Sequence, residues 1–94
     1  MVDEERARAA ALLGTQHSFP GPFGLRVVIV PEAQPVVEAV VAATEGVTLL
    51  DVEVRESSRG RWRSLRLSLQ AETAEAVLDA YAALRGVEGV VVAL

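Results

Sequence analysis

Cysteine is absent from this sequence, which excludes disulfides, thiolate metal sites and a cysteine nucleophile. Small secreted domains commonly rely on disulfides, so a domain of this size without them indicates the reducing cytosol. Lysine and asparagine are also absent, and every basic side chain is an arginine or the single histidine, His17. We therefore predict a cytoplasmic protein.

Long apolar runs are lacking as well. No stretch approaches the roughly 18–20 apolar residues that a membrane-spanning helix needs. The first residues include Asp3, Glu4 and Glu5, whereas a secretory signal begins with basic residues followed by an apolar run. The formal net charge of −4 argues against nucleic acid or an anionic membrane as the main partner. We predict a soluble protein with no membrane attachment.

What is present is one domain with an N-terminal extension. The 94 residues are too few for two hydrophobic cores, and 51% of them are hydrophobic, which is typical of a globular chain. We assign residues 1–18 to the extension, with an alanine-rich helix over Asp3–Leu13 that Gly14 ends. Because this helix has little to bury, we predict that the extension is partly mobile. Residues 19–94 form the domain.

An arm leads into the first strand of the domain. Thr15–Gly24 contains Pro20 and Pro22 beside glycines, which argues against regular structure there. We expect the rings of Phe19 and Phe23 to pin this arm onto the domain.

The domain begins with a strand and a helix. Leu25–Val30 is a short apolar run that is typical of a central strand and ends at Pro31. Pro35 suits the first turn of a helix, where its missing N–H is no loss, and Gly46 supplies a stop. The valines of one helical face are Val36, Val37, Val40 and Val41.

Two alternating segments follow and form a hairpin. Thr48–Ser57 and Trp62–Ala71 each place apolar residues on one face and polar residues on the other. The stretch Ser57–Gly60 between them is a turn signal. We therefore predict two paired strands, each with one buried and one solvated face.

A second helix and a last strand complete the domain. Thr73 is suited to cap the helix, which Gly86 closes, and Val87–Leu94 is a largely apolar strand. The order β–α–β–β–α–β with right-handed crossovers predicts an α+β, ferredoxin-like sandwich, in which a four-stranded antiparallel sheet has both helices on one face. The predicted core is Val27, Ile29, Val37, Val40, Val41, Leu50, Val52, Val54, Leu65, Leu67, Leu69, Val77, Leu78, Tyr81 and Leu84.

Three stretches carry distinctive motifs: Phe19–Phe23 with its two prolines, Ser57–Ser64 at the hairpin, and the ending Val90–Leu94. The second contains Ser-x-Gly-x-aromatic-x-Ser, at Ser58, Gly60, Trp62 and Ser64. In these motifs the sequence, from about residue 19 to its end, resembles the YbeD family of small bacterial proteins of unknown function.

The resemblance implies a ferredoxin-like fold similar to the regulatory ACT domains of amino-acid metabolism, and no known catalysis. ACT domains that bind amino acids rely on a glycine-containing turn after the first strand, and members of the YbeD family often carry a glycine there. Here Val30–Pro35 contains none, which argues against a copied ligand site.

Few residues could carry catalysis. Nucleophilic catalysis needs a base beside the nucleophile, and the only histidine lies in the arm. Asp51 and Glu53 share a strand face, as a catalytic carboxylate pair would. A tight hairpin, however, sets Asp51 opposite Arg66 and Arg55 opposite Trp62, so that charge pairing and cation–π packing account for these residues. We predict no enzymatic activity, no metal site and no cofactor.

The hairpin tip carries the one local basic cluster of the sequence. Its candidate contact residues are Ser58, Arg59, Gly60, Arg61, Trp62, Arg63 and Ser64. Such a cluster suits the capture of an anion or an acidic partner. The alternative is a solvated turn in which Gly60 supplies a positive φ.

Two functions from different classes remain open. The first is a small regulatory or protein-interaction module without catalytic activity, which meets an unknown protein partner through its open sheet face and the hairpin. The second is an ACT-like sensor that binds an amino acid or related small metabolite at a subunit interface. RNA recognition is disfavoured, because such a sheet needs stacking aromatics on its central strands and Leu25–Val30 has none.

The uncovered sheet face is expected to have a polar and an apolar part. Its polar part carries Asp51, Glu53, Arg55 and Arg66. The first and last strands are apolar on both faces and would expose Val28, Val30 or Val91. Because a soluble monomer rarely leaves a large apolar patch in water, we predict a weak homodimer or a partner-binding surface there, with the arm around Phe19 and Phe23 as the rival cover.

Overall fold

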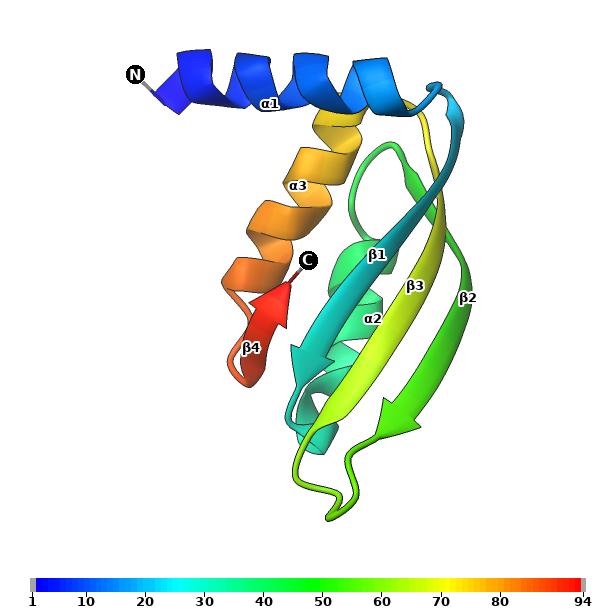
Figure 1. Cartoon of the computed structure of the whole chain (residues 1–94), viewed down its shortest axis with the longest axis vertical. Helices are drawn as coiled ribbons and strands as arrows, with labels where there is room; N and C mark the ends of the chain where they lie inside the picture. The colour runs from blue at the N-terminus through cyan, green and yellow to red at the C-terminus, as the bar shows by residue number, and fades with distance from the viewer. Residues whose placement is uncertain (1, 94) are drawn as a thin grey trace.

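The computed structural model describes residues 2–93, with side chains from Glu4 to Ala93; Leu94, assigned above to the last strand, lies outside the described residues. The elements in chain order are α1 (Val2–Gln16), β1 (Gly21–Ile29), the short 3₁₀ turn η1 (Pro31–Ala33), α2 (Gln34–Ala42), β2 (Val47–Glu56), β3 (Arg63–Ala71), α3 (Ala74–Arg85) and β4 (Val90–Ala93). The sheet is antiparallel, in the order β2-β3-β1-β4. The helices α2 and α3 lie on one of its faces (Figure 1), which confirms the predicted α+β, ferredoxin-like sandwich. None of the helices within residues 2–93 combines the length and the apolar character that crossing a bilayer requires.

Proline and threonine set the starts of the two helices that pack on the sheet. Pro31 follows β1 and opens η1, and Pro35 occupies the first turn of α2 as predicted. Thr73 caps α3, where its hydroxyl accepts a hydrogen bond of 3.1 Å from a backbone N–H of the first turn. α2 ends at Ala42, ahead of the predicted stop, and Gly46 instead takes a φ of 82° in the turn that leads to β2.

One apolar core lies between the sheet and the helices α2 and α3. Nine predicted core residues are at most 1% exposed: Val27, Ile29, Val37, Val41, Leu65, Leu67, Leu69, Val77 and Leu84. Four others are only partly buried: Val40, Val52, Leu78 and Tyr81. The predicted core did not include further buried residues, namely Leu25, Ala33, Val47, Ala71, Ala74, Ala76 and Ala80. The small alanine side chains let α3 approach the sheet closely, which a pattern of large apolar residues does not reveal.

β2 does not follow the predicted alternation. Leu50 and Val54, predicted to be buried, are 61% and 47% exposed. The pairing with β3 skips Leu50, because a β-bulge lies between Leu49 and Asp51. One extra residue reverses which side chains face the core, so Leu49 before the bulge and Val52 after it pack against the core. Val54 lies near the end of this edge strand, where less of the molecule covers it.

β1 begins earlier than predicted, at Gly21, so the expectation of irregular structure up to Gly24 is wrong for the end of the arm. Pro22 lies inside the strand and pairs with β3. A strand tolerates proline where its nitrogen faces away from the partner strand. Val30, at an even-numbered position like Pro22, donates its N–H to the Gly89 carbonyl oxygen at 2.9 Å, on the β4 side. The nitrogen of Pro22 therefore faces the same edge, away from β3.

α1 is longer than predicted and lies across α3. It continues through Gly14 to Gln16. Arg6 forms an ion pair with Asp79 of α3 and donates a hydrogen bond of 3.3 Å to the Glu75 carbonyl oxygen. Figure 1 shows α1 at the end of the molecule away from the β2–β3 hairpin. The mobility of the extension stays a prediction.

The aromatic side chains of the arm gather on the helix side of the sheet. The Phe23 ring packs against the core and makes a T-shaped contact with Tyr81 of α3, with 6.4 Å between ring centroids. His17 lies edge-on to Phe23 at 4.9 Å, and Phe19 lies 6.5 Å from Phe23. The ring of Phe23 thus pins the arm as predicted. Because it does so on the helix side, the arm is not the cover of the open sheet face.

Candidate functional site

The candidate site lies on the sheet face that no helix covers (Figure 1). Side chains alternate along a strand, so residues paired across the sheet point to the same face. The uncovered face carries Pro22, Gly24, Arg26 and Val28 from β1, Ser64, Arg66, Ser68 and Gln70 from β3, and Asp51, Glu53 and Arg55 from β2. Most of these side chains are polar, as predicted for the hairpin strands.

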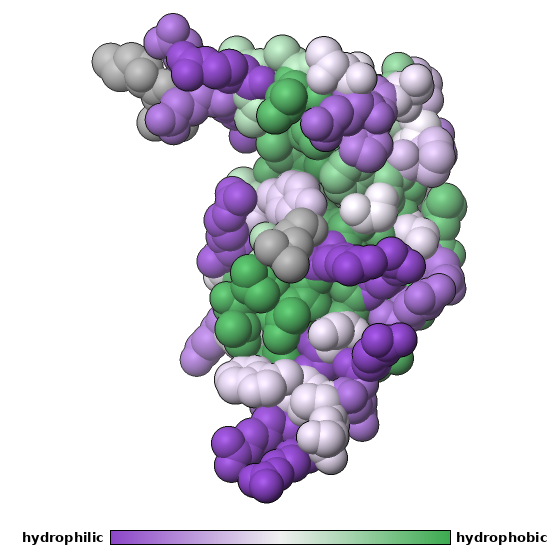
Figure 2. All heavy atoms as spheres, viewed as in Figure 1, coloured by the Kyte–Doolittle hydropathy of each residue, from purple (hydrophilic) through white to green (hydrophobic). Residues whose placement is uncertain are grey.

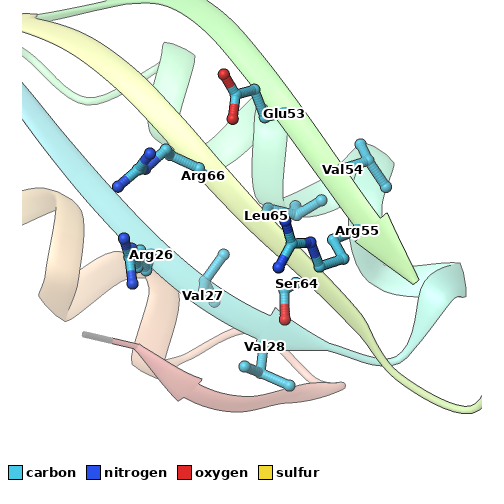
Figure 3. Close-up of a pocket in the computed structure, with 9 residues that line it drawn as sticks. All are labelled: Arg26, Val27, Val28, Glu53, Val54, Arg55, Ser64, Leu65 and Arg66. Atoms are coloured by element: carbon cyan, nitrogen blue, oxygen red, sulfur yellow. The ribbon is translucent and has the colours of Figure 1, made fainter. Parts of the chain in front are cut away.

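Two arginines meet directly across neighbouring strands of this face. Arg26 on β1 is the partner of Arg66 on β3 in the pairing register, and both side chains are exposed. In Figure 3 both extend from the same face of the sheet. Like charges directly opposite each other destabilise a sheet. The contact between these two arginines is therefore unfavourable for the fold, and Glu53, opposite Arg66 on its other side, offsets part of the repulsion.

A third arginine stands beside this pair. Arg55 is the partner of Ser64 in the β2–β3 register, and Figure 3 shows its side chain reaching toward Ser64. Glu53 lies opposite Arg66 in the same register. Among the described side chains, no carboxylate forms an ion pair within 4.0 Å with Arg26, Arg55 or Arg66. The guanidinium groups are thus available to an external anion.

These side chains surround a hollow of about 420 Å³ on the sheet surface (Figure 3). Its polar lining is Arg26, Glu53, Arg55, Ser64 and Arg66, and Val28 adds an apolar side chain. With three arginines against one glutamate, the hollow carries a net positive charge. It can hold an anionic group by hydrogen bonds and charge at once.

The tip of the β2–β3 hairpin is exposed and irregular. Its residues are Ser58, Arg59, Gly60, Arg61 and Trp62, all of them solvent-exposed. Gly60 has a φ of 68°, which confirms that the turn needs a residue free to take a positive φ. The two arginines of the tip make no ion pair within the described residues, so they extend the basic surface beyond the hollow.

The other two predicted hairpin residues have different surroundings. Arg63 forms an ion pair with Glu56 and donates a hydrogen bond of 2.8 Å to Oε1 of Gln34, at the start of α2. It ties the hairpin to the helix layer and is committed to the fold. Ser64 lies in the hollow. The structure therefore divides the predicted site into an exposed tip, a structural arginine and a serine on the open face.

The predicted register of the hairpin is wrong. Asp51 lies opposite Ser68 instead of Arg66, and Arg55 lies opposite Ser64 instead of Trp62. The strands are joined by residues 57–62, which is a longer loop than the tight turn assumed, and this loop shifts the pairing of Asp51 and Arg55 by two residues along β3. Neither the Asp51 charge pair nor the Arg55 cation–π contact exists among the described residues.

Charge is unevenly distributed along the chain. Residues 51–66 contain five arginines and three acidic residues, whereas the whole sequence contains 9 basic and 13 acidic residues. Arg26 adds a further positive charge to the same face. An acidic protein thus presents a basic sheet face and hairpin.

Arg26 is the residue of the candidate site that sequence reasoning missed. It is the only charged residue in the apolar run Leu25–Val30, and this could have marked the outward face of the strand. Its position opposite Arg66 depends on long-range pairing of β1 with β3, which no local pattern specifies.

The connection from β1 to α2, where an ACT-type ligand turn would lie, is tightly packed. The stretch Val30–Pro35 contains no glycine, and the 3₁₀ turn η1 occupies the connection. Gly89, with a φ of 95°, lies so close that an added Cβ would be 2.7 Å from Cγ2 of Val30 and 3.0 Å from Cβ of Ala33. A neighbouring apolar hollow has Glu32 and Glu88 as its charged residues, which would repel a carboxylate ligand.

The acidic residues and the histidine form no metal centre in the part of the chain that the structure describes, where no three of them gather. His17 is exposed and contacts Phe23 through its ring edge. The prediction that the chain is not an enzyme stays a prediction.

The apolar part of the open side lies at β4. Val91 and Val92 are 56% and 40% exposed, and Figure 2 shows hydrophobic surface over β4 and the adjoining end of β1. Val28 and Val30 are partly buried. The exposure predicted for Val91 is confirmed, and whether copies of the chain associate there stays a prediction that sedimentation would test.

Comparisons with known proteins agree on family and fold. A family model described as a protein of unknown function, DUF493, matches residues 14–94. The chain is similar to the ACT domain from the GTP pyrophosphokinase of Chlorobium tepidum, at 13% identity and a TM-score of 0.68, with 79% of this chain and 95% of that chain covered. It is also similar to the C-terminal domain of the MgtC protein from Mycobacterium tuberculosis, at 19% identity and a TM-score of 0.68, with 83% and 87% covered. No curated protein matches. The YbeD-like resemblance and the ACT-like fold are confirmed, and at these identities the two structures show the fold alone.

Proposed function

This chain belongs to the DUF493 family of proteins of unknown function, and we propose that it is a non-catalytic regulatory or interaction module that binds an acidic segment of a protein partner. The contact surface is the uncovered sheet face together with the hairpin tip. One observation carries the proposal: the arginines of this surface have no carboxylate within ion-pair distance among the described side chains. The lack of cysteine supports a cytosolic site of action.

The physical basis is charge complementarity on an otherwise acidic molecule. A basic patch on a protein of net charge −4 attracts anionic segments while the rest of the surface repels them, which orients the encounter. Exposed ion pairs contribute only about 0.2–1 kcal/mol each, so several arginines must act together. Binding of this kind weakens as salt rises, because ions screen exposed charges over a Debye length of about 10 Å at 0.1 M.

A binding role without turnover agrees with the surroundings of the polar residues. The serine in the hollow, Ser64, has arginines and one glutamate around it and no histidine. A hydroxyl nucleophile needs a base positioned to accept its proton, and His17 lies on the helix side with Phe23. The groups on the open face therefore suit recognition more than chemistry.

Fluorescence anisotropy with a labelled ten-residue peptide of alternating Glu and Ser tests the proposal. A peptide with Gln in place of Glu is the matched ligand control. The wild-type chain should bind the Glu peptide and lose affinity steadily as salt rises. The double variant Arg59→Gln, Arg61→Gln should bind about two- to thirtyfold more weakly, since it loses two exposed ion pairs.

Arg8→Gln is the matched protein control, because Arg8 is an exposed arginine of α1 that faces Glu4. It should leave the affinity unchanged. Equal binding of the Glu and Gln peptides, or equal effects of the hairpin and α1 substitutions, would contradict the proposal.

An ACT-like sensor of an amino acid or related metabolite is the second candidate. The similarity to an ACT domain at a TM-score of 0.68 favours it. The absence of glycine in Val30–Pro35 and the acidic residues Glu32 and Glu88 nearby count against it. Thermal unfolding with a panel of amino acids separates the two candidates, because a ligand that binds the native state raises the melting temperature in proportion to its concentration and affinity.

A further inference from the structure

The Arg26–Arg66 pair is not explained by affinity for acidic side chains alone. The arginines of the hairpin tip could serve that purpose without cost to the fold. Arg26 and Arg66 instead lie directly opposite each other on the two central strands, where like charges are unfavourable. A sheet that keeps such a pair exposed is suited to a ligand group that carries more than one negative charge.

The net charge of the hollow indicates how many negative charges its ligand should carry. Arg26, Arg55 and Arg66 line it together with Glu53, which leaves a net charge of about two positive units. A phosphate monoester carries a charge of about −1.5 to −2 at pH 7 and has three acceptor oxygens. A carboxylate carries one charge and two oxygens, which a single guanidinium fork can satisfy.

The donors around the hollow fit the same group. Each guanidinium presents a planar fork of N–H donors, and two forks from neighbouring strands can approach one phosphate from both sides. Arg55 reaches toward Ser64 from β2 (Figure 3), and the Ser64 hydroxyl can donate to a further oxygen. Glu53 is the one carboxylate in the lining, and its charge disfavours more than one anionic group in the hollow.

We propose that this hollow binds a phosphate monoester, with the phosphate oxygens between Arg26 and Arg66 and with Arg55 and Ser64 as further donors. The inference rests on the proposed function and names its ligand: a phosphorylated serine or threonine side chain within the acidic partner segment. The basic surface continues from the hollow to the hairpin tip, where Figure 2 shows strongly hydrophilic surface. A basic surface that extends this far can also contact acidic residues next to a phosphorylated side chain. An isolated small molecule has no such neighbouring residues.

Three peptides of one acidic sequence test this assignment, with serine, phosphoserine or glutamate at the central position. Free O-phospho-L-serine is the small-molecule probe. At fixed ionic strength, the wild-type chain should bind the phosphoserine peptide about tenfold more tightly than the glutamate peptide, because charge-assisted bonds to the extra oxygens are added. Free phosphoserine should bind at least about tenfold more weakly than the phosphopeptide, since it lacks the contacts to the hairpin tip.

Substitutions on the two parts of the surface should separate the two contributions. Arg26→Gln or Arg66→Gln should lower the preference for phosphoserine over glutamate to about twofold or less. Arg61→Gln, outside the hollow, should weaken all peptides alike and leave the preference unchanged. Because Gln at position 26 removes the like-charge contact and leaves Glu53 opposite Arg66, Arg26→Gln should unfold at a temperature no lower than that of the wild type. The phosphopeptide should then raise the melting temperature of the wild type and not of Arg26→Gln.

Equal binding of the phosphoserine and glutamate peptides would overturn the phosphate site and leave the acidic-partner surface standing. No binding of any peptide would overturn both proposals. Free phosphoserine that binds as tightly as the phosphopeptide would overturn the assignment to a protein segment. A preference for phosphoserine that persists in both Arg26→Gln and Arg66→Gln would place the phosphate elsewhere and overturn the inference.

Discussion

The two faces of β3 differ in the burial and the polarity of their side chains. On the helix side, Leu65, Leu67 and Leu69 are 1%, 0% and 1% exposed and fit among their neighbours at interior packing density. On the other side, Ser64 and Arg66 face solvent, and Arg66 even opposes another arginine. A face that is not needed for the core can thus accept an arrangement that costs stability. The comparison places the buried core on one face of the strand and the surface that we propose for recognition on the other.

The largest expected effect tests this division with two leucines. Leu67→Ala should lower the free energy of unfolding by about 2–5 kcal/mol, because it removes a fully buried side chain and leaves a cavity. Leu50→Ala, at the exposed bulge of β2, should change it by less than about 0.5 kcal/mol. Urea titrations of both variants measure the difference. Similar losses at the two positions would show that Leu50 is buried, as strict alternation in β2 would place it.

A second effect, of intermediate size, concerns the turn between α3 and β4. Gly89→Ala should destabilise the chain by about 1–3 kcal/mol, because position 89 has a φ of 95° and the new Cβ would meet Val30 and Ala33. Gly14→Ala is the matched control, since nothing lies within 4 Å of a Cβ there and the residue is inside α1. It should stabilise α1 by about 0.5–1 kcal/mol. Thermal unfolding of both variants provides the measurement, and a neutral Gly89→Ala would mean that this connection is loosely packed.

The smallest effect is a pH dependence of the free energy of unfolding, caused by Tyr81 at the edge of the core. Burial raises the pKa of the Tyr81 phenol above its ordinary value, and the nearby Arg85 guanidinium partly opposes that rise. The phenol therefore stays neutral to higher pH in the folded chain than in the unfolded chain. Its contribution to stability should be complete below about pH 10, the unfolded pKa, and be lost as pH rises through the folded pKa.

Denaturant titrations between pH 9 and 11 would measure this loss, and Tyr81→Phe should remove that part of it. Because Tyr81 is the only tyrosine, its ionisation can be followed directly by ultraviolet absorbance. An absorbance titration that gives a pKa at or below 10 in the folded chain would contradict the partial burial of the ring.

The covered face of the central strands could be predicted from the sequence because one physical rule decides it. Alternation in β3 predicted the burial of Leu65, Leu67 and Leu69. The positions of Pro35 and Thr73 predicted where α2 and α3 begin. The resemblance to the YbeD family and the βαββαβ order led to the correct fold. These features depend on local pattern and chemistry.

The rest depends on contacts between distant parts of the chain. The bulge at Leu50 and the loop at 57–62 change the register of β2, and neither has a sequence signal as clear as alternation. The hollow needs Arg26 and Arg66 to meet, which follows only from the pairing of β1 with β3. The hairpin arginines could be found from the sequence because they are close together in the chain. The Arg26–Arg66 pair could not be found in this way, because its members are 40 residues apart.

Pro22 has a consequence for the chain as one molecule among many copies of itself. Within the described residues, β4 pairs with β1 from Val27 to Ile29, so the earlier part of β1 has a free edge. A free edge with unpaired N–H groups is a template on which a strand of another molecule can add, and this leads to aggregation. Proline offers no N–H, and its ring obstructs a neighbouring strand. At the unpaired start of β1, it therefore opposes edge-to-edge assembly between copies of the chain.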